Sequence, residues 1–153
     1  IVSDKVFEVI NRGGDFNHGF TYSGHPVAAA VALENIRILR EEQIIETVRA
    51  ETAPYLQKRL RELADHPLVG EVRGVGMLGA IELVKDKETR ARYEGKDAGM
   101  LCRGHCFNNG LIMRAVGDTM IISPPLVISK AEIDELVTKA RLCLDLTLKD
   151  LQA

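Results

Sequence analysis

Hydrophobic residues recur every three or four positions between residues 41 and 66, as expected for a helix with one buried face. The positions that form this stripe are Ile45, Val48, Thr52, Leu56, Leu60 and Leu63. Pro54 lies inside the stripe, which continues in phase beyond it, so we predict a kinked helix rather than two separate helices. His66 and Pro67 then end the helix.

After Pro67 the hydrophobic period changes from that of a helix to that of a strand. Residues 69–73 and 77–84 are predicted to be strands, and alternate positions of the second place Met77, Gly79, Ile81 and Leu83 on one face. The glycines between residues 74 and 79 match the G-x-G-x-x-G dinucleotide motif, but the residues after them alternate like a strand instead of opening a helix. We therefore predict a glycine-rich hairpin.

A second hairpin and two further helices follow. Asp97 is a predicted cap for a helix that ends at Asn109-Gly110, and Ser129 with Glu132 forms a predicted capping box for the last helix. Residues 111–116 and 119–123 are predicted to be strands joined by a two-residue turn. Together these elements predict an α+β fold in which a small antiparallel sheet is covered by helices on one face.

Composition narrows the function classes. The chain has 153 residues, of which 46% are hydrophobic and 27% charged, with a formal net charge of -2. This balance lacks the basic excess of nucleic-acid binding proteins, and no apolar run reaches the length of a membrane span. No signal peptide is evident, so we expect a cytoplasmic protein. The charged connection over residues 85–96 is interpreted as solvated surface.

The three cysteines do not predict a disulfide framework, because their number is odd and two of them stand four residues apart on one helix. Cys102, His105 and Cys106 resemble a metal cluster in composition. Zinc sites usually carry a second pair of ligands at a recognisable spacing, and none follows here. We interpret these residues as part of the core and predict no metal site.

The most polar functional candidate is the glycine-spaced segment 18–26, which leads directly into an apolar helix. Ser23 is a predicted N-cap, and Pro26 suits the first helical turn. A helix N-terminus with nearby hydroxyl groups is a natural seat for a phosphate or carboxylate, so Thr21, Tyr22 and Ser23 are candidates for anion contact. The alternative is a capped helix without a ligand.

The segment Phe20-Thr21-Tyr22-Ser23-Gly24-His25-Pro26 closely resembles the part of class III (omega-type) aminotransferases in which a threonine binds the phosphate of pyridoxal phosphate. Further segments extend the resemblance along the chain: Val72-Arg73-Gly74-Val75-Gly76-Met77, Leu111-Ile112-Met113-Arg114, Gly117-Asp118 and Ser123-Pro124-Pro125-Leu126-Val127. The resemblance implies a pyridoxal phosphate cofactor contacted by Thr21 and Phe20, and a homodimer with the cofactor site at the subunit interface. It also implies the C-terminal domain of a fold-type I enzyme.

The lysine that forms the Schiff base in this family lies upstream of the stretch that matches Ile1. Lys5 does not replace it, because it lies among helix-surface residues with no apolar pocket to lower its pKa. We therefore expect the chain to be a C-terminal fragment that cannot transaminate by itself. The expected parts are a remnant of the large cofactor-binding domain (1–22), a linking helix (23–40) and a small domain (41–153).

Arg114 interrupts an otherwise apolar strand. Pairing across the Gly117-Asp118 turn places it on one face with Ile112, Val116 and Ile121. Arginine is rarely buried without a partner, so this residue predicts either a structural salt bridge to an acid of the chain or capture of a substrate carboxylate. The family resemblance favours the second role, since similar aminotransferases carry a mobile arginine here that binds the keto-acid.

Two function classes follow. The first is a fragment of an aminotransferase that moves an amino group between an amine or amino acid and a keto-acid such as pyruvate, and within this class a pyridoxal phosphate decarboxylase or aminomutase is the nearer alternative. The second is a non-catalytic α+β module that binds or senses a small molecule, because fold alone does not decide function.

Overall fold

A computed structural model describes residues 2–13, 19 and 21–153. The chain divides into two compact units, residues 1–38 and 39–153. The first unit contains α1 (Asp4–Arg12) and most of α2 (Pro26–Glu41), and none of the residues of these two helices is buried. The finer division at residues 22 and 40 stays a prediction.

The helix α2 begins at Pro26, so the prediction of Ser23 as its N-cap was wrong. Residues 21–24 form a turn instead, in which the His25 amide donates a hydrogen bond of 3.2 Å to the Tyr22 carbonyl. Gly24 has a φ of +75°, a left-handed conformation that a helix cannot include. Pro26 occupies the first helical position, as predicted.

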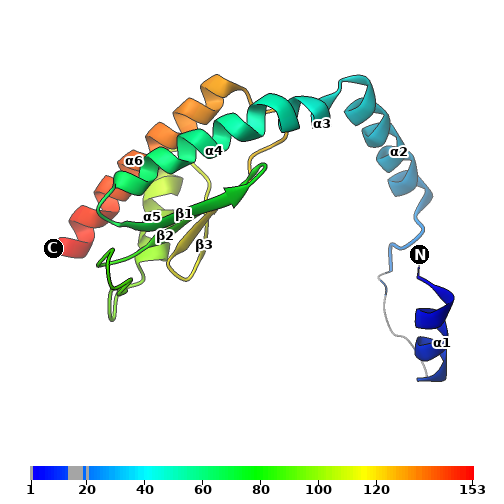
Figure 1. Ribbon diagram of the computed structural model, residues 1–153, viewed down its shortest axis with the longest axis horizontal. Coiled ribbons are helices and arrows are strands. Elements are labelled where there is room, and N and C mark those ends of the chain that lie inside the picture. The colour runs from blue at the N-terminus through cyan, green and yellow to red at the C-terminus, as the bar shows by residue number, and fades with distance from the viewer. Residues whose placement is uncertain (1, 14–18, 20) are drawn as a thin grey trace. The chain divides into compact units, whose positions relative to one another are not determined.

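The second unit combines helices with a four-stranded sheet, drawn in Figure 1. Its helices are α3 (Ile44–Thr47), α4 (Ala53–Arg61), α5 (Ala98–Asn108) and α6 (Lys130–Gln152), and its strands are β1 (Val69–Val75), β2 (Leu78–Leu83), β3 (Arg114–Val116) and β4 (Thr119–Ile122). The strand order is β1-β2-β4-β3, and every neighbouring pair is antiparallel. The predicted α+β fold is confirmed.

The predicted kink near Pro54 takes the form of a π-helical turn, Val48–Thr52, between α3 and α4. A π-turn widens the backbone ladder by one residue, which accommodates a ring without an amide donor just beyond it. The helix thus continues past the proline, and a 3₁₀ turn (Glu62–Asp65) ends it before His66 as expected. From Thr52 onward the stripe is buried, whereas Ile45 is exposed.

The two faces of the sheet differ sharply in burial. Gly79, Ile81 and Leu83 of β2 are buried on the helix side together with Met120 and Ile122 of β4. Figure 1 shows α4, α5 and α6 on this side. The opposite face, which we call the open face, carries alternate residues that are exposed or half-buried, among them Leu78 and Val116.

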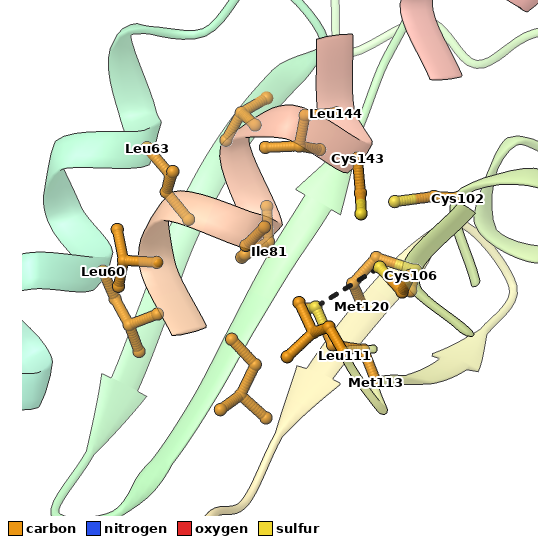
Figure 2. Close-up of a cluster of buried hydrophobic side chains, with 14 of the residues drawn as sticks. Leu60, Leu63, Ile81, Cys102, Cys106, Leu111, Met113, Met120, Cys143 and Leu144 are labelled. Atoms are coloured by element: carbon orange, nitrogen blue, oxygen red, sulfur yellow. Dashed lines mark hydrogen bonds between the residues drawn. The ribbon is translucent and has the colours of Figure 1, made fainter. Parts of the chain in front are cut away.

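The core between the sheet and α5 and α6 is rich in sulfur. Cys102, Cys106 and Cys143 are buried free thiols, and Figure 2 shows them beside Met113 and Met120. The Cys106 Sγ atom lies 3.8 Å from the Met113 Sδ atom. These cysteines act as small apolar side chains that fill space between the helices, as the sequence predicted.

Polar anchors fix the ends of the last two helices as predicted. Asp97 accepts a hydrogen bond from the Met100 amide at the start of α5. Ser129 and Glu132 form a complete capping box at the start of α6. No helix within the described part of the chain is long and apolar enough to cross a membrane.

Candidate functional site

Thr21 opens the turn that precedes α2, and its side chain is exposed. Among the described residues its hydroxyl has no hydrogen-bond partner, and the first turn of α2 contains no acidic residue. Amide groups at a helix N-terminus have no partner within the helix and carry positive partial charge. The local charge and the free hydroxyl therefore fit a phosphate oxygen.

Phe20, the second predicted cofactor contact, lies outside the described residues, as does His18. Thr21 belongs to the first compact unit and Arg114 to the second, so each is considered with its own surroundings. The roles of all three predicted site residues thus stay predictions, while the surroundings of Thr21 and Arg114 can be described.

Arg114 is the first residue of β3, an edge strand of the sheet. It pairs with Ile121 of β4, and Val116 pairs with Thr119, which is the register predicted from the two-residue turn. Ile121 pairs in turn with Ala80 of β2. Because side chains of directly opposed residues share one face of a sheet, Arg114 projects from the open face beside an apolar row.

From the sequence we expected this face to be buried, and in this chain it is exposed. Arg114 itself is exposed, and the described residues include no hydrogen-bond acceptor or carboxylate paired with it. The structural salt bridge, one of the two alternatives, is therefore absent from the described chain. No burial penalty arises either, because solvent reaches the guanidinium.

The carboxylates of the open face form ion pairs with other arginines. The Glu82 carboxylate on β2 lies 3.0 Å from Arg73 Nη1 and 3.7 Å from Arg92 Nη2. The Glu71 carboxylate lies 3.1 Å from Arg90 Nη1. These pairs leave Arg114 as a cation that the neighbouring carboxylates do not neutralise. Its guanidinium is consequently available to an external carboxylate.

The charged connection over residues 85–96 contributes two of these arginines, Arg90 and Arg92, which the sequence analysis treated as solvated surface. They are half exposed, yet both reach carboxylates of the sheet. The density of arginine in that connection was the only signal in the sequence, and it did not indicate which strand the connection would meet.

The sequence analysis also considered a metal site at Cys102, His105 and Cys106. Within the described residues, no group of His, Cys, Asp and Glu is arranged to hold a metal. His105 instead pairs with Asp150 on α6 at 2.9 Å. A hydrogen bond with Cys102 raises the pKa of the Cys106 thiol, and burial raises the pKa of Cys143. Neither group is a ready nucleophile at neutral pH.

Comparison with known proteins finds relatives that are all named as aminotransferases or transaminases. The family described as aminotransferase class III matches residues 1–144. A putrescine–pyruvate aminotransferase of Pseudomonas aeruginosa is 76% identical over 147 residues, covering 96% of this chain and 32% of that protein. A mitochondrial gamma aminobutyrate transaminase 1 of Solanum lycopersicum is 41% identical over 137 residues, covering 89% of this chain and 26% of that protein.

Solved structures agree. An omega transaminase from Pseudomonas jessenii in complex with PMP is 38% identical with a TM-score of 0.82, covering 96% of this chain and 32% of that chain. A transaminase solved with L-alanine is 43% identical with the same TM-score, covering 97% of this chain and 35% of that one. The chain thus spans about a third of the length of the relatives it matches. All these relatives are named as aminotransferases or transaminases, which favours the enzyme over the regulatory module.

Proposed function

The chain belongs to the class III aminotransferase family, and from that premise we propose that the intact protein transfers an amino group from an amine to a keto-acid. The relative at 76% identity is named for putrescine and pyruvate, and these are the proposed donor and acceptor. A homodimer is proposed from the family resemblance, and a cytoplasmic location is proposed as the sequence analysis expected.

The observation that carries the proposal is the unpaired Arg114 on the open face of the sheet. A keto-acid such as pyruvate presents a planar carboxylate, and a guanidinium binds a carboxylate through two parallel hydrogen bonds. Ile121 and Ala80, in register beside Arg114, offer an apolar surface to the rest of a small substrate. Putrescine has no carboxylate, so this contact would serve the acceptor and not the donor.

Thr21 supports the second half of the proposal, the cofactor. Pyridoxal phosphate supplies, when bound, the electron sink that amino transfer requires. The exposed Thr21 hydroxyl would donate a hydrogen bond to a phosphate oxygen, and the start of α2 adds a favourable dipole without a nearby acid. Phe20 is proposed beside it from the resemblance. In the homodimer this phosphate would belong to the cofactor of the partner subunit.

The experiment is an amino-transfer assay on the intact protein. We expect alanine to form from pyruvate when putrescine is supplied with pyridoxal phosphate, and we expect none with the 153-residue chain alone, because the family's Schiff-base lysine lies upstream of it. Alanine formation by the 153-residue chain would contradict the fragment interpretation. An intact protein that instead releases carbon dioxide from an amino acid would favour the decarboxylase.

A further inference from the structure

A groove in the second unit lies between α4 and the edge strand β1, and we call it the α4–β1 groove. Its volume is about 500 Å³. Arg49, Pro54, Gln57 and Arg61 line the helix side, and Gly74 and Val75 line the strand side. Arg114, the proposed carboxylate contact in the same unit, does not line it.

Two cations of this groove lack partners. Arg49 and Arg61 are exposed, and neither forms an ion pair or hydrogen bond with another described residue. Of the residues that the structure describes, no aspartate or glutamate lines the groove. Arg59, on the same helix, provides a contrast, because Asp134 accepts a hydrogen bond of 2.7 Å from its Nε atom. The groove therefore holds positive charge that the described chain does not neutralise.

The strand side of the groove offers main-chain hydrogen bonds. β1 is the first strand in the order β1-β2-β4-β3, so within the described part of the chain only β2 pairs with it and its outer edge has no strand neighbour. Gly74, at the groove, has no side chain of its own, and the side-chain amide of Gln57 lies in the space that a β-carbon there would fill. Gln57 holds the hairpin to α4 by donating hydrogen bonds of 2.9 Å to the carbonyls of Gly76 and Leu78. The edge is thus held at a fixed distance from the helix.

The spacing of the two arginines indicates the length of the ligand. They are twelve positions apart, which corresponds to roughly 18 Å along a helix at 1.5 Å per residue. An extended peptide covers that length with about five or six residues at 3.3 Å each. A single phosphate or carboxylate could contact only one of the two guanidiniums.

We propose that the α4–β1 groove binds an acidic peptide segment of another protein in an extended conformation. The segment pairs with the free edge of β1 and places carboxylates on Arg49 and Arg61. Peptide addition to a sheet edge takes affinity from main-chain hydrogen bonds and specificity from alternate side chains. Glu71, the acid of β1, is already paired with Arg90 and does not oppose the ligand.

The test uses the intact protein and a fluorescein-labelled hexapeptide of alternating glutamate and valine. We expect fluorescence anisotropy to report binding that weakens as salt is raised from about 50 to about 300 mM. The double variant Arg49→Ala/Arg61→Ala should bind roughly tenfold more weakly, the loss of two exposed ion pairs. Lys58→Ala removes an exposed cation of α4 outside the groove lining and should change the affinity less than about twofold.

A second measurement separates strand pairing from charge attraction alone. The peptide should slow amide hydrogen exchange within residues 69–75 of the wild-type protein. In the double variant the exchange of the same residues should not change when the peptide is added. Equal binding by the double variant, or no protection of β1, would overturn the proposal. Displacement of the peptide by inorganic phosphate at the same concentration would also overturn the proposal. So would a dimer that the wild-type chain forms without peptide and that the double variant does not form.

Discussion

The Cδ1 atom of Leu60 on α4 occupies the space above Gly79 on β2, so that a β-carbon added to this glycine would come within 2.5 Å of it. Leu60 is fully buried and therefore has little freedom to move aside. The absence of a side chain at position 79 is what lets α4 lie close against the sheet.

We predict that Gly79→Ala lowers the free energy of unfolding by about 1–3 kcal/mol, the usual cost of overpacking a core. Leu60→Ala alone should cost about 2–5 kcal/mol, and less in the Gly79→Ala background, because the clash is then removed. Urea unfolding of the 153-residue chain measures all three variants.

Gly104 on α5 is the matched control for this prediction, because a β-carbon there would meet no atom within 4 Å. Gly104→Ala should stabilise the chain by about 0.5–1 kcal/mol, since alanine loses less backbone entropy in a helix interior. Purely additive costs for Gly79→Ala and Leu60→Ala would contradict the close packing of α4 on β2.

Asp134 on α6 gives a prediction for acid pH. A hydrogen bond of 2.7 Å from the Tyr55 hydroxyl lowers the pKa of this carboxyl, and Arg59 lowers it further against the opposing effect of desolvation. A group whose pKa is depressed on folding stabilises the protein above its unfolded pKa of about 4, and the stabilisation is lost as the pH falls through the folded pKa.

Asp134→Asn should accordingly flatten the decline of stability below about pH 4 while changing the pH dependence little near neutrality. Tyr55→Phe removes the largest of the stabilising hydrogen bonds and should reproduce part of that change. Thermal melts of the wild type, Asp134→Asn and Tyr55→Phe between about pH 2 and 7 test both expectations. If the melting temperature of Asp134→Asn fell at acid pH as steeply as that of the wild type, this carboxylate would not couple α4 to α6.

For Arg114 we predict a split between the two substrates of the intact enzyme. Arg114→Ala should raise the apparent KM for pyruvate by about tenfold or more and change the KM for a carboxylate-free amine much less, as expected for lost ground-state binding. Arg103→Ala removes an exposed arginine of α5 and serves as the control. Equal impairment with both substrates would instead assign Arg114 to the packing of the enzyme.

For Thr21 we predict weaker cofactor retention. Thr21→Ala in the intact enzyme should lower the affinity for pyridoxal phosphate by about 1–3 kcal/mol, the usual loss when a hydrogen bond to a charged group is removed. Cofactor absorbance after dialysis measures the effect, with Lys5→Ala, at an exposed residue of α1, as the control. If the alanine variant kept its cofactor as firmly as the wild type, the proposed phosphate contact would be wrong.

The sequence alone determined the features that depend on near neighbours. The period of apolar positions fixed which segments are helices and strands, and the two-residue turn at Gly117-Asp118 fixed the register that pairs Arg114 with Ile121. The caps at Asp97 and Ser129 followed from local hydrogen bonds for the same reason. The family was also recognisable, because its motifs are short and ordered along the chain.

Only the tertiary structure decided which face of the sheet the helices cover, and hence that Arg114 is exposed. Alternation specifies that a strand has two faces, but both faces of β3 carry apolar residues, so the pattern did not distinguish them. Two of the arginines that pair with Glu82, Arg90 and Arg92, come from a connection whose path depends on packing. Likewise His66 meets Asp145 at 3.2 Å across 79 positions, a contact that exists only after α6 packs beside the end of α4.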